Sequence, residues 1–211
     1  MTNTILQITR VDQDLINDLM PSFENLPKTD HADGHYRLRK YARVLCDAEG
    51  SVQISRLDST DFTQSAKYNK HQGDKKRTFE PIEDSVINSN AIREMVDVVR
   101  AASELGVRFE FDIHQMRVIC TGGATQLSPE GWHQDGYDCV AMIGISRCNI
   151  IGGEVLLSEC KTEKPFLEAP IDPGTMVIVD DSVLWHNGRS IQPIDDEKPA
   201  YMDLLVFTIK K

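Results

Sequence analysis

The sequence contains no long hydrophobic run, no closely paired cysteines and no excess of basic residues. None of its uninterrupted apolar stretches approaches the ~18 residues that suggest a membrane-spanning helix. The first residues lack a basic region followed by an apolar segment, so we expect no secretory signal. The five cysteines are an odd number without CxxC or zinc-binding spacing, which favours reduced thiols over a disulfide framework. Together these absences predict a soluble cytoplasmic protein.

Acidic residues outnumber basic ones by 33 to 23, and the formal net charge is -10 at pH 7. Such a protein repels the phosphates of nucleic acids and anionic lipids. We therefore expect no nucleic-acid or membrane partner, and favour a small molecule. Two local basic clusters are either solvated faces or sites for a carboxylate-bearing ligand. One comprises Arg37, Arg39, Lys40 and Arg43, and the other Lys75, Lys76 and Arg77.

With 211 residues, 40% of them hydrophobic and 27% charged, the chain predicts one globular domain over residues 1–211. No internal repeat, low-complexity tract or Pro/Gly/Ser-rich linker divides it. The pattern nevertheless changes after residue 106. We expect residues 1–106 to form a buttress of helices and strands, and residues 107–211 to form the core barrel.

The first half predicts helices and one hairpin. A short helix is expected over 11–24. Alternation of polar and apolar residues predicts strands over 36–47 and 51–57, joined by a turn at 48–50.

A longer helix is predicted over 88–105, with Ser89 as its N-cap and Gly106 as its stop. Its apolar face would comprise Ile92, Met95, Val96, Val99 and Ala102.

The second half predicts strands separated by turns rich in Gly, Pro and Asp. The predicted strands are 107–120, 138–146, 154–158, 176–179, 183–186 and 201–209. Helices followed by strands indicate an α+β fold, in which the helices support an antiparallel sandwich or jelly-roll barrel. A jelly roll would gather the strand ends of this half at one open mouth.

Three residues in this half form a candidate metal site. His133 and Asp135 are two positions apart, so both side chains face one side of an extended chain. His186 ends a strand-turn-strand segment that would return it to the same mouth. Two imidazoles and one carboxylate leave open coordination positions and favour Fe(II). Zinc uses the same ligand types and is the competing metal.

Segments along nearly the whole chain are similar to those of one enzyme family. They are Arg37-x-Arg39-x-Tyr41-x-Arg43, Tyr68-Asn69 through Gly73, Lys76-Arg77 with Phe79, His114-Gln115-Met116-Arg117, Asn149-Ile150-Ile151-Gly152-Gly153 and Asp203-Leu204-Leu205-Val206-Phe207-Thr208. Together with the candidate metal ligands, they resemble the Fe(II)/2-oxoglutarate dioxygenase superfamily. More narrowly, the chain resembles the bacterial group that includes isoleucine 4-hydroxylase and BsmA.

The resemblance implies a double-stranded β-helix, the jelly-roll, cupin-like barrel of that superfamily. It implies that His133, Asp135 and His186 are the catalytic residues and bind Fe(II), with 2-oxoglutarate and O2 as co-substrates. The implied reaction hydroxylates a free amino acid or a similarly small charged metabolite, while 2-oxoglutarate is decarboxylated to succinate. Substrate-binding residues are expected to be Arg37, Arg39, Tyr68 and Asn69.

One position departs from the family pattern. The far carboxylate of 2-oxoglutarate usually meets an arginine early on the last strand, because a guanidinium fork matches a carboxylate. This chain has Met202 at that position. We expect Arg117 or Arg189 to bind the carboxylate instead. Lys198 and Lys210 are less suitable, since one lies in a loop and the other near the C-terminus.

The missing arginine also supports an alternative function. The chain would then be a non-catalytic or 2-oxoglutarate-independent metal-binding barrel, acting as a small-ligand sensor or stress-response factor. The intact set of His133, Asp135 and His186 favours the enzyme over this alternative.

Overall fold

A computed structural model of the chain describes residues 5–57, 61–69, 72–120, 122–161 and 164–210. Its helical elements are α1 (Gln13–Leu19), η1 (Met20–Phe23), α2 (Asp84–Ile87) and α3 (Asn90–Ala102). Its strands are β1 (Leu6–Arg10), β2 (Arg37–Asp47), β3 (Gln53–Arg56), β4 (Asp61–Phe62), β5 (Arg77–Thr78), β6 (Glu80–Pro81), β7 (Arg108–Ile119), β8 (Cys139–Cys148), β9 (Ile150–Gly152), β10 (Glu154–Ser158), β11 (Leu167–Pro170), β12 (Thr175–Asp180), β13 (Trp185–Gly188), β14 (Ile191–Pro193) and β15 (Tyr201–Ile209). None of the described helices has the length and apolar character needed to cross a membrane.

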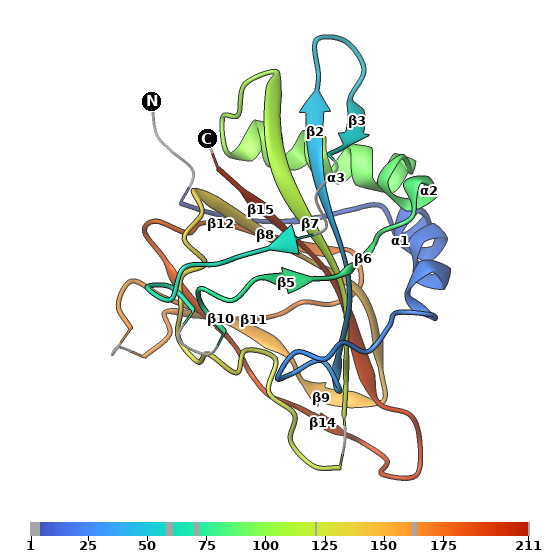
Figure 1. Cartoon of the computed structure of the whole chain (residues 1–211). Coiled ribbons are helices and arrows are strands. Elements are labelled where there is room, and N and C mark those ends of the chain that lie inside the picture. The colour runs from blue at the N-terminus through green and yellow to red at the C-terminus, as the bar shows by residue number, and fades with distance from the viewer. Residues whose placement is uncertain (1–4, 58–60, 70–71, 121, 162–163, 211) are drawn as a thin grey trace.

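The protein is mostly β-sheet with few helices (Figure 1). One large sheet has the strand order β1-β12-β8-β15-β7-β2-β3, and β6 joins it beside β2. A three-stranded sheet has the order β11-β10-β13, and two short pairs are formed by β14 with β9 and by β4 with β5. Within the described residues the strands form these separate sheets and no closed barrel. The first half of the chain contributes β1, β2 and β3 to the large sheet, so it does more than support the second half from outside.

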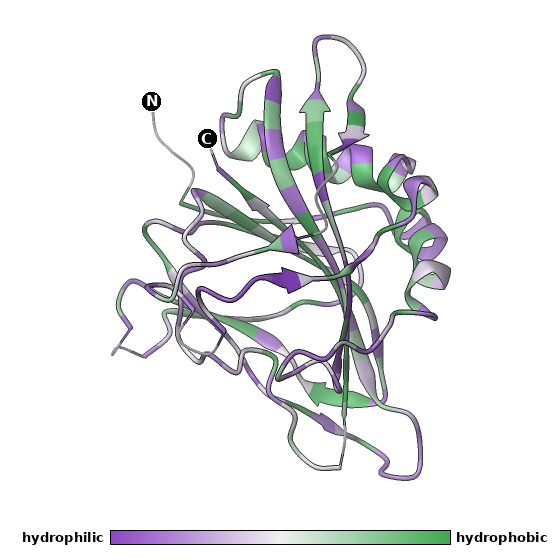
Figure 2. Ribbon diagram, viewed as in Figure 1, coloured by the Kyte–Doolittle hydropathy of each residue, from purple (hydrophilic) through white to green (hydrophobic). Residues whose placement is uncertain are grey.

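The large sheet buries both of its faces because alternate residues of a strand point to opposite sides. On β15, Leu205, Phe207 and Ile209 join the hydrophobic core that includes α1 and α3. Met202 and Leu204 join a second core with side chains of β10 and β14. Much of the central strands is accordingly hydrophobic, as the green colour in Figure 2 shows. We call these two sides the helix face and the pocket face.

Several predicted elements are confirmed. The β2–β3 hairpin pairs in antiparallel register, as the alternation indicates. The predicted first helix is split, since α1 gives way to the 3₁₀ turn η1 that carries Pro21 in its first turn. Proline lacks the N–H that a continuing α-helix needs.

Helix α3 begins as predicted, with the Ser89 side chain accepting a hydrogen bond from the Ile92 N–H. The predicted stop at Gly106 is wrong. The helix ends at Ala102, and the left-handed residue that follows is Glu104, with φ of 50°. The strand prediction also missed several strands that are short or lie at sheet edges, namely β1, β4, β5, β6, β9, β11 and β14.

A buried ion pair on the helix face joins two central strands. Arg117 on β7 donates from Nε and Nη2 to the two carboxylate oxygens of Asp203 on β15, at 2.7 and 2.8 Å. Ser146 of β8 donates to the same carboxylate at 2.6 Å. The guanidinium also stacks on the ring of Tyr201, 3.9 Å from its centroid. The pair therefore ties three neighbouring strands together.

Replacing Arg117 by Met should destabilise the protein by about 3 kcal/mol, because the change leaves a buried carboxylate without its cation. Urea unfolding followed by circular dichroism measures the loss. Arg189→Met is the matched control, since this half-exposed arginine should change stability by no more than about 0.5 kcal/mol. Equal midpoints for the two variants would contradict a structural role for the Arg117–Asp203 pair.

Candidate active site

Two backbone hydrogen bonds bring the two candidate histidines together. The N–H of His133 donates to the carbonyl of His186 at 3.0 Å, and the N–H of His186 donates to the carbonyl of His133 at 2.9 Å. This antiparallel bridge connects the loop before β8 to the first residues of β13. Directly paired residues project to the same side, so the imidazole centroids lie 4.2 Å apart.

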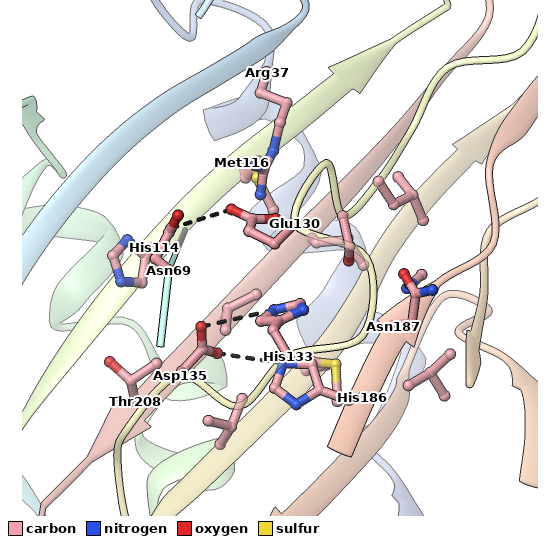
Figure 3. A pocket seen from close by; sticks show the side chains of 18 of the residues that line it. Arg37, Asn69, His114, Met116, Glu130, His133, Asp135, His186, Asn187 and Thr208 are labelled. Carbon is pink, nitrogen blue, oxygen red and sulfur yellow. Dashed lines mark hydrogen bonds and ion pairs between the residues drawn. The ribbon is translucent and has the colours of Figure 1, made fainter. Parts of the chain in front are cut away.

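Asp135 completes the cluster (Figure 3). Its Oδ1 lies 3.8 Å from Nε2 of His133, and its Oδ2 lies 3.4 Å from Nε2 of His186. One ligand atom from each of these residues falls within 4.8 Å of the others. His133 Nδ1 is 2.8 Å from the carbonyl of Gly131, so this nitrogen carries the proton and Nε2 is available to a metal. Two imidazoles and one carboxylate on one side of an ion fit Fe(II).

The electrostatics of the cluster suit a cation. Burial and the neighbouring His186 lower the pKa of His133, which keeps its imidazole neutral. Burial would raise the pKa of Asp135, but the hydrogen bond to His186 and the nearby imidazoles hold it well below its ordinary value. Burial would lower the pKa of His186, yet Asp135 and Asp181 outweigh that effect and raise it. The same negative charge that favours a proton on His186 would also favour a metal cation at this point.

Asp181 positions the metal-binding loop, a role that the sequence analysis missed. Its carboxylate accepts backbone hydrogen bonds from Asp135 at 3.0 Å, Gly136 at 2.7 Å and Tyr137 at 3.1 Å. It also lies 3.5 Å from Nδ1 of His186. The side chain is fully buried. A second acidic residue directly after the buried strand β12 was the available signal.

A network of buried amide side chains begins at the metal-ligand candidate Asp135. Gln64 donates from Nε2 to Oδ1 of Asp135 at 2.9 Å and to its backbone carbonyl at 3.0 Å. Asn69 donates to the Gln64 side-chain oxygen at 2.9 Å and to Glu130 at 3.2 Å. Gln64 binds Oδ1, while Oδ2 stays turned toward His186, on the side where a metal would bind.

The network continues to an arginine of the pocket. Gln72 donates its backbone N–H to Asn69 at 2.7 Å and its side-chain amide to Asp33 at 2.9 Å. Asp33 in turn pairs with Nη1 of Arg37 at 2.6 Å. Hydrogen bonds and one ion pair, with the backbone N–H of Gln72 as one link, thus connect Asp135 to Arg37.

One pocket contains the metal cluster and several basic side chains. Its polar lining includes Arg37, Arg39, Asn69, Arg77, His114 and Glu130, and its apolar lining includes Met116, Val140, Met142, Val155, Leu204 and Val206. Arg39 is 8% exposed and Arg77 is 4% exposed. Among the described residues, neither contacts a carboxylate within ion-pair distance. Arg39 reaches the sulfur of Met116 at 3.3 Å, and Arg77 lies over the ring of Phe62 at 4.8 Å.

These uncompensated charges alter their neighbours. Burial, together with the positive charge of Arg37, lowers the pKa of Arg39 to about 9. Burial and the nearby Arg39 and Arg77 lower the pKa of His114, so its imidazole is neutral. A buried cation without a carboxylate at ion-pair distance is costly, and this part of the pocket therefore favours binding of an anion.

The structure brings together most of the residues that the sequence singled out. Arg37, Arg39 and Asn69 line the same pocket as the metal cluster. Tyr68 instead packs its ring against the backbone of Gly136, outside the pocket lining. A Cβ added to Gly136, whose φ is +85°, would lie 2.4 Å from this ring, so the contact requires glycine.

The two arginines expected to bind 2-oxoglutarate lie elsewhere. Arg117 is on the helix face, because His114, Met116 and Val118 take the alternate positions of β7 that face the pocket. Arg189 is half-exposed and pairs with Glu154 and Glu168. Arg77 belongs to the second basic cluster of the sequence. Its position in the pocket depends on the pairing of β4 with β5, which places it opposite Phe62.

Nearly the whole chain matches one known protein family. The family model described as 2OG-Fe dioxygenase matches residues 20–208. The chain belongs to the 2OG-Fe dioxygenase family. Enzymes of this family use Fe(II), 2-oxoglutarate and O2, and the cluster of His133, Asp135 and His186 suits the iron. These co-substrates supply the oxidation, while the protein binds, orients and shields the reactants.

Solved structures share the fold. A BsmA homolog from Methylobium petroleophilum PM1 is 26% identical with a TM-score of 0.81, over 94% of this chain and 81% of that one. IDO from Bacillus thuringiensis is 18% identical with a TM-score of 0.73, over 97% and 90%. The Fe(II)/α-ketoglutarate-dependent dioxygenase TqaL is 13% identical with a TM-score of 0.71, over 98% and 82%. No curated protein matches the chain.

In this 2OG-Fe dioxygenase, replacing Asp135 or His186 by Ala should weaken Fe(II) binding by more than roughly 100-fold. Loss of a residue that only hydrogen-bonds to a ligand costs roughly 10–100-fold, and loss of a ligand itself should cost more. Anaerobic calorimetric titration with Fe(II) measures the affinity. His35→Ala, which removes an exposed histidine outside the cluster, is the control. Unchanged iron affinity in either ligand variant would refute the ligand assignment.

Replacing Gln64 by Leu should lower the Fe(II) affinity of the 2OG-Fe dioxygenase roughly 10–100-fold, because Asp135 loses the donor that orients its carboxylate. The same titration applies, with exposed Gln126→Leu as the matched control. If both variants bind iron as the unmodified protein does, Gln64 has no positioning role.

Proposed function

We propose that this 2OG-Fe dioxygenase hydroxylates a free amino acid or a similarly small charged metabolite. In the overall reaction a substrate C–H, 2-oxoglutarate and O2 give the alcohol, succinate and CO2. One O2 oxygen enters the alcohol and the other enters succinate. The observation that carries the substrate class is the pair of buried arginines, Arg39 and Arg77, that share the pocket with the metal cluster and lack an acidic partner among the described residues.

A substrate with a carboxylate would neutralise the positive charge of these two arginines. Guanidinium groups bind carboxylates through two parallel hydrogen bonds, and a carboxylate would offset the cost of burying Arg39 and Arg77. Glu130 lines the same pocket and accepts a hydrogen bond from Asn69, so it can pair with an ammonium group. A zwitterionic amino acid presents both charges at once.

Of the predicted substrate residues, Arg39 would contact the carboxylate. Arg37, held by Asp33, and Asn69, held against Glu130, would shape the polar end of the pocket. Tyr68 would act indirectly by packing on Gly136, next to a metal ligand.

The apolar wall narrows the substrate further. Val140, Met142, Val155 and Val206 face the pocket with aliphatic side chains or a thioether. This lining suits an aliphatic amino acid, in keeping with the sequence resemblance to the isoleucine 4-hydroxylase and BsmA group. We also propose that the large sheet and the three-stranded sheet together form a double-stranded β-helix, and that the chain is a single domain.

One observation supports the alternative of a 2-oxoglutarate-independent metal-binding sensor. Met202 offers no charge at the position where the family resemblance expects an arginine. The metal cluster with its supports Asp181 and Gln64 favours the enzyme, because a sensor without oxygen chemistry has no need of an open, oriented Fe(II) site.

Purified protein with Fe(II), 2-oxoglutarate and O2 should release succinate faster when the correct free amino acid is added. Screening the free amino acids and measuring succinate and hydroxylated product tests this. Arg39→Met should raise the KM for that amino acid roughly 10–100-fold, because a charged hydrogen bond is lost. Arg43→Met is the control, since half-exposed Arg43 on the same strand pairs with Glu110. If no amino acid stimulates succinate release, the proposed substrate class is wrong.

A further inference from the structure

The position of Met202 defines a row of side chains across the pocket face of the large sheet. The strand register pairs Met202 with Arg147 of β8 on one side and with Val118 of β7 on the other. Val118 in turn pairs with Arg37 of β2. Directly paired residues share a face, so both arginines belong to the pocket side. Arg147 is one strand away from Met202, about 4.8 Å across the sheet, whereas Arg37 is two strands away, about 10 Å.

Arg147 reaches that face through an irregularity of the strand. The β8–β15 register shifts between Asp203 and Leu204, which pair with Ser146 and Gly144. Ile145 is therefore an extra residue on β8. It joins the helix-face core, while Ser146 also points to the helix face and binds Asp203. Arg147 consequently lies beside Met202 on the pocket side.

The guanidinium of Arg147 has one poorly satisfied nitrogen. Its Nη2 donates to the carbonyl of Gly152 at 2.5 Å, and its Nε lies 3.5 Å from the half-exposed carboxylate of Asp172. Its Nη1 contacts the sulfur of Met202 at 3.9 Å. A thioether is a weak acceptor, so Nη1 of Arg147 points toward Met202 without a hydrogen bond to an oxygen atom of the described residues. The Arg147 side chain is only 17% exposed.

Arg147 and Met202 are not part of the pocket lining, but Gly153 beside them is. Gly153 lines the pocket and has φ of +83°. A Cβ at this position would lie 2.9 Å from both Nη1 of Arg147 and the sulfur of Met202. A side chain at position 153 would therefore clash with Arg147 and Met202, and glycine leaves the two in contact next to the pocket lining.

We propose that Arg147 binds the far carboxylate of 2-oxoglutarate in place of the arginine that Met202 replaces. The unbranched Met202 side chain has several rotatable bonds and can move aside as the carboxylate approaches Nη1. Arg117 lies on the helix face, and Arg37 is committed to Asp33. Asp172 competes with the ligand for the same guanidinium. The inference rests on the family's co-substrate and not on the identity of the amino acid substrate.

Binding of 2-oxoglutarate to the anaerobic Fe(II) protein, followed by calorimetry and by the visible absorption of the chelate, tests the assignment. Arg147→Met should raise the Kd for 2-oxoglutarate roughly 10–100-fold, since a charged hydrogen bond is lost, and should leave the Fe(II) affinity unchanged. Arg189→Met should bind 2-oxoglutarate as the unmodified protein does. Asp172→Asn should lower the Kd, because it removes a competing carboxylate.

A rescue variant separates binding from folding. Adding Met202→Arg to Arg147→Met should restore the affinity, because a guanidinium returns to the same row. Unchanged 2-oxoglutarate affinity in Arg147→Met, or a loss confined to Arg39→Met or Arg77→Met, would overturn the assignment. If Arg147→Met does not fold, the Asp172→Asn variant decides, and an unchanged Kd there refutes the proposal. Failure of every amino acid to stimulate succinate release would overturn the proposed function while leaving these binding results intact.

Discussion

Successive residues of a strand point to opposite faces of its sheet, and the division of β7, β8 and β15 between core and pocket depends on that alternation. Along β15, the odd positions Leu205 and Phe207 pack toward the helices, and the even positions Leu204 and Val206 face the pocket. The extra residue in β8 reverses the alternation near its end. One inserted residue thus decides that Arg147 accompanies Met202.

The metal cluster depends on a second constraint, the backbone bridge between His133 and His186. Two hydrogen bonds fix the imidazoles side by side, and the buried carboxylate of Asp181 then fixes the loop that carries Asp135. Gln64 approaches the same carboxylate from a distant segment. These contacts orient the three ligand side chains toward one point, where a metal would bind.

Charge is distributed unevenly between the surface and the pocket. The chain has a formal net charge of -10, yet buried guanidinium groups of Arg39 and Arg77 face the pocket. Aromatic rings and a thioether surround these groups, and Asp33 neutralises only Arg37 closely. Desolvated charges of this kind act strongly at short range, whereas the net charge of the chain sets the long-range field.

The sequence by itself determined the local features. The spacing of His133 and Asp135 indicated shared ligands, alternation indicated the β2–β3 hairpin, and Ser89 marked the start of α3. These features depend on neighbours within a few residues, which is why pattern alone is sufficient for them.

Tertiary structure decided what depends on distant pairing. Alternation shows that neighbouring strand residues face opposite sides, but only the packed sheet shows that Arg117 faces the helices and Met116 faces the pocket. The role of Asp181 and the place of Arg77 likewise arise from contacts between segments far apart in the chain. The candidate anchor Arg147 depends on the register between β8 and β15, because a strand's partner and its bulges are set by the sheet as a whole.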